Sequence, residues 1–491
     1  MKHFLAFDLG AESGRLILGI LNNEQLTIKE LHRFPNRMLR IGNHLRWDIK
    51  YLCREISKGL EIYSAKYKLQ PQSIGIDTWG VDFGLLDKNG RLIENPCTYR
   101  DARTKGMMEQ LFKTFPRQRL YKLTGIQIIP INTVFQLYSM SRHNSPALRK
   151  AKDLLFIPDI LNYYLTGVKA TEFTFATTSQ LYNPNKNAWE PDIFKAIKIP
   201  ISLMQPIIRP GAVIGCLKDE ISKSSGLGSV SVVAIGSHDT ASAVAAVPAQ
   251  GNGWAYISSG TWSPMGIETE SPVINRKSLA MNFTNEGGVG NKYRFLKNIT
   301  GLWLLQQCRK CWDGNQDYNK LAIMAGKAPA FRSIIDPDCP EFINPPDMAA
   351  AITRYCIRTG QPAPDSPARF TRCILESLAL KYRYVLEQLK QFSKQPVRRI
   401  HIIGGGARNK LLCQFTANAT GLPVIAGPIE ATAIGNIMVQ AMADGTVKSL
   451  DEMRAVIRGS FRTEIYKPVN TQKWNNIYKH FIKLLDIKQG L

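Results

Sequence analysis

The segment VAIGSHDTASAV, residues 233–244, places His238 and Asp239 where an apolar strand-like run gives way to an alanine-rich helix-like run. A carboxylate at the start of a helix is kept ionised by the positive end of the helix dipole. Asp239 can therefore act as a base at neutral pH. The simpler interpretation is that Asp239 or Thr240 caps the helix, which is the commonest use of such residues. His238 favours a site, because it has no reason of its own to be a cap and its imidazole can donate to a polar substrate.

A second group of candidate residues lies near the N-terminus, in DLGAESGR over residues 8–15. The small residues of this segment allow the backbone to approach a phosphate, while Ser13 offers a hydroxyl and Arg15 a fixed cation. Asp8 offers a hard oxygen of the kind that Mg²⁺ or its water shell binds. The alternative is a plain hairpin turn that contains an Asp and a Gly.

Two turns in the second half of the chain are also poor in bulky side chains. SSGT, residues 258–261, offers hydroxyl and N–H groups without charge, which suits a γ-phosphate. Residues 404–406 are three glycines that follow the apolar run RRIHII, and they permit a nucleotide to approach closely. The alternative there is a merely tight turn. Neither a Walker A pattern nor a Rossmann GxGxxG after a strand is present, so the sequence predicts a phosphate site of another kind.

The segment KNITGLWLLQQCRKC, residues 297–311, carries two further candidates. Asn298 can orient a sugar hydroxyl and Gln306 a nucleotide phosphate, although a satisfied loop Asn and a surface Gln are the simpler interpretation. Cys308 and Cys311 have the spacing of half a zinc site, but no second CxxC or paired His accompanies them. The helical period of the segment instead predicts two buried thiols on one helix face.

The elements of the first half are predicted from apolar runs and their period. HFLAFDLG, residues 3–10, and the following AESGRLILGIL indicate a strand, a tight turn and a second strand. A third strand over 26–34 precedes the helix-like segment IKYLCREISKGLEIYSAKY, and residues 73–86 are predicted as one buried strand. The predicted order is β, β, β, α, β.

The second half opens in the same way as the first. Residues 248–253 have a loop composition, and residues 254–268 again indicate a strand, a small-residue turn and a strand. Further on, a long helix over 369–392 precedes the strand RRIHIIGGG and another helix that opens at Ala407.

The repeated opening predicts two domains, an N-terminal one over residues 1–247 and a C-terminal one over residues 248–491. A length of 491 residues agrees with this division, since a domain usually has roughly 100 to 200 residues. Two similar α/β domains that each open with a hairpin turn suggest a cleft between them. In that cleft each turn would contribute backbone N–H groups to one shared polyphosphate.

The charge balance is unusual, because 63 Lys and Arg against 39 Asp and Glu give a net charge of +24. Such a charge attracts nucleic acid, anionic lipid or phosphorylated small molecules. The basic residues are spread along the chain without a long basic run, so we interpret them as solvated surface and expect no nucleic-acid partner. The N-terminus lacks the apolar core of a signal peptide, and no window reaches ~18 apolar residues. We therefore expect a cytoplasmic protein with no membrane partner and with reduced cysteines. We also expect a monomer or a weak homo-oligomer, although no motif determines the oligomeric state.

Eight motifs together resemble the FGGY family of carbohydrate kinases: DLGAESGR, IGIDTWGVDF, GSHDTASAV, YISSGTWS, NEGG, KNITGLWLLQ, IHIIGGGARN and VIAGPIEATAIGN. They occur in the family's order and cover about residues 3–440. The resemblance implies an α/β fold of two actin-like (ribonuclease-H-like) domains that flank a central ATP and sugar cleft. It also implies ATP and Mg²⁺ as cofactors, and transfer of the γ-phosphoryl group to O1 of L-rhamnulose in L-rhamnose catabolism.

The resemblance further implies roles for individual residues. Asp239 matches the catalytic base, and Asp8 matches the carboxylate near the metal. The implied sugar contacts are Gly80, His238, Asp239, Thr240 and Asn298. The implied ATP contacts are Ala11, Glu12, Ser13, Gly14, Arg15, Thr261, Gln306 and Gly405. The chain departs from the family at Glu12, where the family usually has Ser, so we expect only the main chain of Glu12 to take part and its side chain to point away.

Two alternatives to this function remain open at the level of sequence. The first is another kinase of the same fold that acts on fuculose, xylulose or glycerol. The second is an actin-like ATP-dependent binding protein whose positive charge serves nucleic acid.

Overall fold

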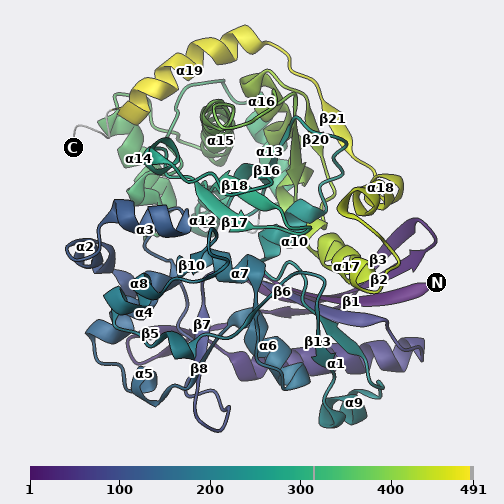
Figure 1. The fold of residues 1–491 in the computed structure, drawn as a ribbon. Helices are drawn as coiled ribbons and strands as arrows, with labels where there is room; N and C mark the ends of the chain where they lie inside the picture. Colours follow the sequence, from purple (N-terminus) through teal and green to yellow (C-terminus); the bar gives the residue numbers. More distant parts are fainter. Residues whose placement is uncertain (313–315, 487–491) are drawn as a thin grey trace. The chain divides into compact units, whose positions relative to one another are not determined.

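A computed structural model describes residues 1–312 and 316–486 (Figure 1). The chain forms two compact units, each assembled from three stretches of sequence. Unit 1 comprises Met1–Pro248, Glu268–Phe295 and Ala431–Ser460, and unit 2 comprises Ala249–Ile267, Leu296–Glu430 and Phe461–Leu491. The chain therefore passes between the units several times.

The described residues contain both strands and helices along the whole chain. The strands are β1 (Lys2–Leu9), β2 (Ser13–Asn22), β3 (Gln25–Pro35), β4 (Met38–Ile41), β5 (His44–Trp47), β6 (Ser73–Thr78), β7 (Phe83–Leu86), β8 (Asp153–Phe156), β9 (Thr171–Glu172), β10 (Tyr182–Asn183), β11 (Ala188–Trp189), β12 (Ile207–Ile208), β13 (Val213–Cys216), β14 (Ser231–Val233), β15 (Trp254–Ser258), β16 (Met265–Thr269), β17 (Thr284–Gly287), β18 (Tyr293–Lys297), β19 (Arg399–Ile403), β20 (Val424–Ala426) and β21 (Glu464–Tyr466). The α-helices are α1 (Ile49–Tyr67), α2 (Met107–Phe112), α3 (Arg117–Thr124), α4 (Thr133–Arg142), α5 (Pro146–Lys150), α6 (Ile157–Thr166), α7 (Phe173–Thr178), α8 (Pro191–Ile197), α9 (Asp219–Ser225), α10 (Asp239–Ala245), α11 (Arg276–Ala280), α12 (Trp303–Cys311), α13 (Tyr318–Lys327), α14 (Met348–Arg358), α15 (Pro367–Leu389), α16 (Lys410–Thr420), α17 (Ala431–Ala443), α18 (Leu450–Ser460) and α19 (Thr471–Asp486).

The main sheet of unit 1 has six strands in the order β13-β14-β6-β1-β2-β3. β1 and β2 form an antiparallel hairpin, and β3 continues antiparallel to β2. β6 lies parallel to β1 on the other side of the hairpin. The first three strands and α1 confirm the predicted elements of the first half, with the short strands β4 and β5 inserted before the helix.

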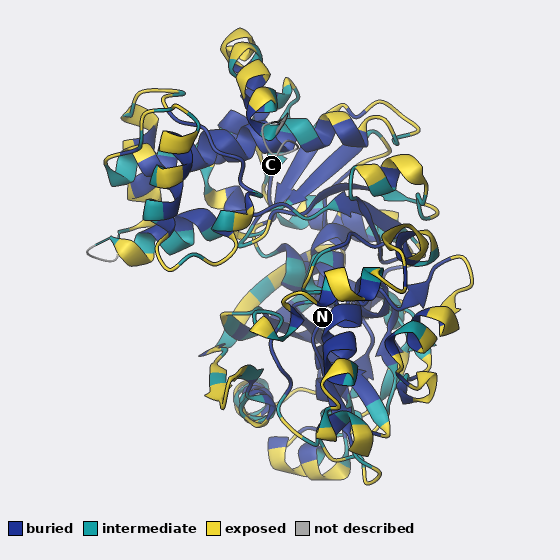
Figure 2. Cartoon of the chain, turned by 90° about the vertical axis from the view of Figure 1, so that its left-hand side faces the viewer, coloured by how far each residue is buried: buried dark blue, intermediate teal, exposed yellow. Residues whose placement is uncertain are grey.

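Helices cover both faces of this sheet, because successive side chains of a strand point to opposite faces. On one face, α1 approaches so closely that a Cβ added to Gly59 would lie 3.1 Å from side-chain atoms of both Phe7 and Leu16. On the other face, α17 packs against β2, where a Cβ added to Gly19 would lie 2.5 Å from Ile437. The strands β1 and β6 and most of β2 are therefore buried between helices, and Figure 2 draws buried residues in dark blue.

A second core in unit 1 surrounds the antiparallel pair β7 and β8. Apolar side chains of α2, α3, α4 and α8 pack against these two strands. α6 begins directly after β8 and joins this core to the main sheet through buried residues that include Ile160 and Leu161. The loop between β6 and β7, which contains Gly80, therefore leads directly into this core at Phe83.

Unit 2 repeats the arrangement at the start of unit 1. β15 forms an antiparallel hairpin with β16 and lies parallel to β19, as β1 pairs with β2 and β6. β20 is parallel to β19, and β21 is antiparallel to β20. The long helix α15 is buried along most of its length and packs against α16 and α13. The predicted hairpin over 254–268 and the predicted helix over 369–392 are confirmed.

Two predicted elements were wrong in extent. Residues 73–86 form two strands, β6 and β7, because the chain turns at Trp79–Asp82, where Val81 has φ +67°. The helix predicted to open at Ala407 begins instead at Lys410, after a 3₁₀ turn over Gly405–Arg408. The side chain of Asn409 accepts a hydrogen bond from the N–H of Leu412, and such a cap fixes where a helix begins.

The prediction for the two neighbouring cysteines was half wrong. α12 forms as the period of the segment predicts, and Cys308 is buried. Cys311 is exposed, and its thiol donates to the carbonyl of Gln307 one turn earlier. The spacing of three residues turns Cys311 toward the edge of the helix face that Cys308 occupies.

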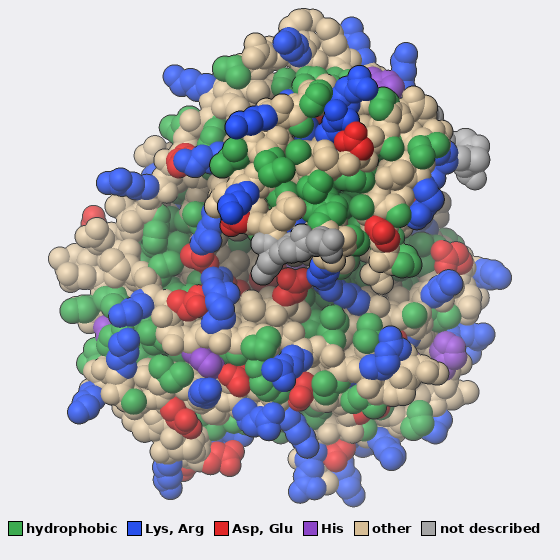
Figure 3. Space-filling model, turned by 180° about the vertical axis from the view of Figure 1, so that it is seen from behind, with side chains coloured by type: hydrophobic (Ala, Val, Ile, Leu, Met, Phe, Trp, Pro, Cys, Tyr) green, Lys and Arg blue, Asp and Glu red, His purple; other side chains and the backbone are tan. Residues whose placement is uncertain are grey.

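The basic residues are scattered over the face shown in Figure 3, where Lys and Arg alternate with acidic, apolar and polar side chains. Within the described parts of the chain, none of the helices combines the length and the apolar character that a membrane crossing requires.

Candidate active site

Four of the predicted sugar-binding residues lie together in unit 1, where α10 begins. His238 occupies the N-cap position of α10, and Asp239 is the first residue of the helix. The Oδ1 atom of Asp239 accepts hydrogen bonds from the N–H of Thr240 at 2.5 Å and from its hydroxyl at 3.0 Å. His238 is thus the cap by position, contrary to the sequence argument, but its side chain makes no capping hydrogen bond. The carboxylate of Asp239 is held in place while 34% of its side chain stays exposed.

Gly80 completes this group from the loop that follows β6. Thr78 pairs with the chain ahead of α10, since its N–H donates to the carbonyl of Ser237 at 2.8 Å. A Cβ added to Gly80 would lie 3.2 Å from Nε2 of His238. A side chain at this position would crowd the imidazole of His238. The glycine therefore leaves room for the ring beside Asp239.

The predicted metal carboxylate, Asp8, lies between two charged neighbours in the sheet. Its strand places it in register with Arg15 on β2 and with Asp77 on β6. The guanidinium of Arg15 donates to Oδ2 of Asp8, whose side chain is only 10% exposed. Arg15, which was predicted to bind phosphate, therefore also neutralises the charge of Asp8.

Asp77 is a buried carboxyl that the sequence analysis did not single out as a site residue. Burial and, next, the charge of Asp8 raise the pKa of Asp77 well above its ordinary value, while the amide of Asn436 opposes this by donating to Oδ2 at 2.6 Å. The charge of Asp239 also raises this pKa. The charges of Asp8 and Asp239 therefore both act on Asp77 within unit 1. The available signal was an Asp near the end of a short, mostly apolar strand, in IGIDT.

The turn between β1 and β2 is closed by a hydrogen bond from the N–H of Gly10 to the carbonyl of Ser13 at 2.9 Å. Ala11, Glu12 and Ser13 lie in this turn, and Glu12 is exposed. Gly14 has a packing reason for its size, because an added Cβ would lie 2.4 Å from the ring of Phe34. The small size of Gly14 is thus explained by the core as well as by any phosphate.

Two predicted ATP contacts meet in unit 2. The hydroxyl of Thr261 donates to Oε1 of Gln306 at 3.2 Å, which joins the turn after β15 to the first turns of α12. The N–H of Trp303 also donates to the carbonyl of Thr261, at 3.2 Å. Asn298 follows β18 and is partly buried. Two hydrogen bonds therefore join the turn after β15 to the start of α12.

The three glycines after β19 have different reasons to be glycine. Gly404 has φ +81°, a conformation that side chains disfavour. Gly406 lies against the turn after β15, since its N–H donates to the carbonyl of Ser259 at 2.7 Å and an added Cβ would lie 2.0 Å from the Ser259 hydroxyl. Gly405 is exposed, and nothing lies within 4 Å of the place of its Cβ. Only Gly405 leaves open space of the kind that a ligand could use.

The sequence also matches known proteins along nearly its whole length. Residues 3–246 match the N-terminal domain, and residues 255–443 the C-terminal domain, of the FGGY family of carbohydrate kinases. The chain belongs to this family. It is therefore a carbohydrate kinase, a phosphotransferase with an alcohol group as acceptor, in a family that uses ATP as the phosphate donor.

Several curated relatives of this FGGY kinase carry the name rhamnulokinase. One from Bacteroides thetaiotaomicron is 48% identical over 480 residues, which cover 98% of this chain and 99% of that protein. One from Oceanobacillus iheyensis is 41% identical over 468 residues, covering 95% and 99%.

Solved structures of other sugar kinases share the fold of this chain. A xylulose kinase from Lactobacillus acidophilus has a TM-score of 0.83 at 16% identity, with 100% of this chain and 98% of that chain covered. Plasmodium falciparum glycerol kinase with ADP has a TM-score of 0.77 at 17% identity, with 99% and 98% covered. The two-domain α/β fold expected from the sequence is confirmed.

The FGGY kinase contains a buried carboxylate, Asp82, that shapes the loop around Gly80. Its Oδ2 accepts hydrogen bonds from the indole N–H groups of Trp47 at 2.7 Å and Trp79 at 3.0 Å, and from the N–H of Tyr99 at 3.0 Å. Burial raises the pKa of Asp82 to about 6, while these donors oppose the shift. The sequence analysis quoted the motif IGIDTWGVDF but assigned no role to this Asp, because two of its partners, Trp47 and Tyr99, lie 35 and 17 positions away in the chain.

Glu172 is a second buried carboxylate of the FGGY kinase, and it contacts the segment just before α10. It caps α7 by accepting from the N–H groups of Thr174 at 2.8 Å and Phe175 at 3.1 Å. It also accepts from the N–H of Ser237 at 3.2 Å, one residue before His238. Burial raises the pKa of Glu172 to about 7 against these hydrogen bonds.

Because the folded protein raises the pKa of Glu172, it favours the protonated form. The stabilisation is complete below about pH 4.5 and is lost as pH rises to about 7. This one group should lower the free energy of unfolding by about 3 kcal/mol across that range. Glu172→Gln cannot ionise, so urea unfolding at pH 5 to 8 should show a flatter dependence on pH for the variant. Glu220→Gln, at an exposed side chain, is the control and should follow the wild type. Parallel curves for wild type and Glu172→Gln would contradict this prediction.

The glycines after β19 provide a matched pair of variants. Gly406→Ala should lower the free energy of unfolding by about 1 to 3 kcal/mol, because the methyl group overlaps Ser259. Gly405→Ala should change stability by less than about 0.5 kcal/mol, since its Cβ meets open space. If ATP passes over Gly405, the same methyl group should raise the KM for ATP about tenfold. Urea unfolding and steady-state kinetics measure the two effects, and an unchanged KM would remove Gly405 from the ATP contacts.

Proposed function

We propose that this kinase transfers the γ-phosphoryl group of ATP to O1 of L-rhamnulose, giving L-rhamnulose 1-phosphate. The observation that carries the proposal is the 48% identity, over nearly the full length of both chains, to a protein named rhamnulokinase. The group formed by Gly80, His238, Asp239 and Thr240 supports it, because it offers a carboxylate next to a hydroxyl and an imidazole that can form hydrogen bonds. Such a group suits a neutral polyol better than an anion.

We further propose a division into an N-terminal kinase domain over residues 1–247 and a C-terminal one over residues 248–491. The family matches over 3–246 and 255–443 support this boundary. The packing units differ from it, since Glu268–Phe295 and Ala431–Ser460 pack with unit 1. The sugar contacts except Asn298 then belong to unit 1, together with Ala11–Arg15, whereas Asn298, Thr261, Gln306 and Gly405 belong to unit 2.

In the proposed reaction, Asp239 accepts the proton of the sugar's O1 hydroxyl as that oxygen attacks the γ-phosphorus. The contacts of Asp239 with Thr240 and His238 fix the direction of its carboxylate before the substrate binds. Gly80, His238, Thr240 and Asn298 orient the sugar. Most of the catalysis in such phosphoryl transfers comes from positioning and charge stabilisation.

The proposed ATP contacts are those implied by the family resemblance. The main chain of the turn between β1 and β2 would donate N–H groups to the phosphates, with only the backbone of Glu12 taking part. Thr261 and Gln306, already joined by a hydrogen bond, would contact the nucleotide together. The members of the set are Ala11, Glu12, Ser13, Gly14, Arg15, Thr261, Gln306 and Gly405.

Mg²⁺ is part of the proposal, and the residues of unit 1 fit it. Asp8 provides a hard oxygen ligand, and the neighbouring Asp77 has a buried Oδ1 atom without a hydrogen-bond partner among the described residues. A cation near Asp8 would relieve the repulsion that raises the pKa of Asp77. When bound with ATP, the ion would neutralise charge on the phosphate oxygens.

A coupled assay of ADP release over a panel of acceptors tests the substrate. L-rhamnulose should give a kcat/KM at least roughly tenfold above L-fuculose, D-xylulose and glycerol. An equal or higher value for another acceptor would replace L-rhamnulose in the proposal. ATP hydrolysis that does not depend on any sugar would instead support an ATP-dependent binding protein.

A further inference from the structure

A fully buried arginine, Arg294, lies behind the proposed sugar-binding histidine. Arg294 is on β18 and is 0% exposed. Its Nε donates to the carbonyl of Gly287 at 2.9 Å, and its Nη2 lies 3.1 Å from Oε2 of Glu286 on β17. Burying two charges costs several kcal/mol that their attraction often fails to recover. Apolar residues of similar volume often replace such a pair without loss of stability, which points to a role for this pair other than stability.

The second contact of Arg294 supplies that reason. Its Nη2 lies 3.2 Å from Nδ1 of His238 with hydrogen-bond geometry. A guanidinium group can only donate, so Nδ1 has to be the acceptor in this bond. A neutral imidazole that accepts at Nδ1 carries its proton on Nε2. Glu286 also approaches Nδ1, at 3.4 Å, but its carboxylate is already paired with the arginine.

The other ring nitrogen of His238 faces the proposed reaction. Nε2 lies 3.5 Å from Oδ1 of Asp239 and next to Gly80, where a Cβ would come within 3.2 Å. A proton on Nε2 therefore points toward the place where Asp239 meets the sugar. The ring is also held by its own backbone, whose N–H donates to the hydroxyl of Thr174 at 3.2 Å.

We propose that Arg294 is a positioning residue that holds His238 as the Nε2–H tautomer, so that the imidazole donates a hydrogen bond to a sugar oxygen beside Asp239. Glu286 balances the charge of the arginine. The link to the sugar rests on the proposed function, whereas the tautomer is a property of the free protein. A donor fixed in one direction favours an acceptor with an oxygen at that point and rejects one that lacks it.

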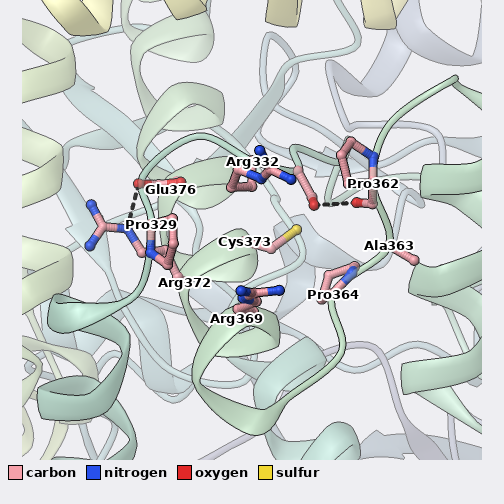
Figure 4. Close-up of a pocket in the computed structure, with 10 residues that line it drawn as sticks. Pro329, Arg332, Pro362, Ala363, Pro364, Arg369, Arg372, Cys373 and Glu376 are labelled. Atoms are coloured by element: carbon pink, nitrogen blue, oxygen red, sulfur yellow. Dashed lines mark hydrogen bonds and ion pairs between the residues drawn. The ribbon is translucent and has the colours of Figure 1, made fainter.

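The variant that tests the proposal replaces both charges at once, Glu286→Met with Arg294→Met. Removing both charges together avoids leaving either one buried without the other, so the variant should fold with a melting temperature close to that of the wild type. Arg294→Lys is the conservative variant, because it keeps a positive charge beside Glu286 and a donor near Nδ1. A matched control is the double variant Arg372→Met with Glu376→Met. It removes the ion pair of 2.8 Å in the pocket of unit 2 drawn in Figure 4, and no predicted site residue lines that pocket.

The first measurement is the ¹⁵N spectrum of the free protein labelled at histidine. The chain has seven histidines, and a His238→Gln variant identifies the signals of His238. The wild type and the control should show a protonated Nε2 and an unprotonated Nδ1 in His238. The Glu286→Met and Arg294→Met double variant should show a mixture of both tautomers, and Arg294→Lys should retain mostly the wild-type form. A protonated Nδ1 in the wild type, or an unchanged tautomer in the double variant, would overturn the proposal.

The second measurement separates binding of the sugar from binding of ATP. The double variant at Glu286 and Arg294 should raise the KM for the sugar roughly tenfold or more, and leave the KM for ATP unchanged. Arg294→Lys should restore part of the loss, and the control should match the wild type. Equal increases of both KM values, or an increase in the control, would also overturn the proposal. If no ketose is phosphorylated while the tautomer is as expected, the proposed function fails and the positioning of His238 stands.

Discussion

Asp239→Asn is expected to lower kcat by a factor of roughly 10² to 10⁴, the usual span for the loss of a general base. The amide cannot take the proton of the attacking hydroxyl, but it has nearly the same shape and still accepts at its oxygen from Thr240. The KM values for sugar and ATP should therefore change by less than about threefold. Initial rates of ADP release and calorimetric titration of the sugar measure both effects.

The control for this variant is Asp192→Asn, which neutralises a surface carboxylate. Asp192 is paired with Arg119 at 2.7 Å, and both side chains are about half exposed. Its kinetics should match those of the wild type. Turnover of Asp239→Asn within a factor of about two of the wild type would exclude Asp239 as the base.

Gly435→Ala is expected to lower the free energy of unfolding by about 1 to 3 kcal/mol. Gly435 lies on α17, and an added Cβ would stand 1.8 Å from the carbonyl oxygen and 2.5 Å from the carbonyl carbon of Ser242 on α10. These are backbone atoms, so the clash can be relieved only by moving one helix away from the other. Because α10 begins with Asp239, kcat should fall as well. Urea unfolding and ADP release measure the two losses.

The control for Gly435 is Gly459→Ala on α18. No atom lies within 4 Å of the place of its Cβ, and alanine is the better helix former. This variant should be neutral or more stable by about 0.5 to 1 kcal/mol. Equal stability of the two alanine variants would show that α10 and α17 do not depend on the close contact at Gly435.

Much of the fold could be predicted from the sequence, because it depends on local patterns. The strands β1, β2 and β3 and the helix α1 follow from apolar runs and from a period of 3.6 residues. The hairpin of β15 and β16 follows from the small residues between them. The break between β6 and β7 could not be predicted in this way, because no Pro interrupts the run. The chain turns there around Asp82, whose partners Trp47 and Gln136 come from other elements.

The candidate site was predicted only in part for the same reason. Gly80, His238 and Asp239 were proposed from their motifs, and the structure brings them together in unit 1. The residues that support them were not predicted from the sequence, because each contacts a partner far away in the chain. Glu172 binds Ser237 across 65 positions, and Arg294 binds His238 across 56.

The sequence by itself determined the family, the order of the main elements and the residue types that can carry out phosphoryl transfer. Only the tertiary structure decided the pKa values of the buried carboxyl groups around them and the orientation of the His238 ring. Burial raises the pKa values of Asp77, Asp82 and Glu172, and the charges of Asp8 and Asp239 raise that of Asp77 further. A buried guanidinium orients the imidazole of His238. The physical reason is that desolvation and hydrogen bonding depend on which atoms surround a group in space, and neighbours along the chain do not reveal them.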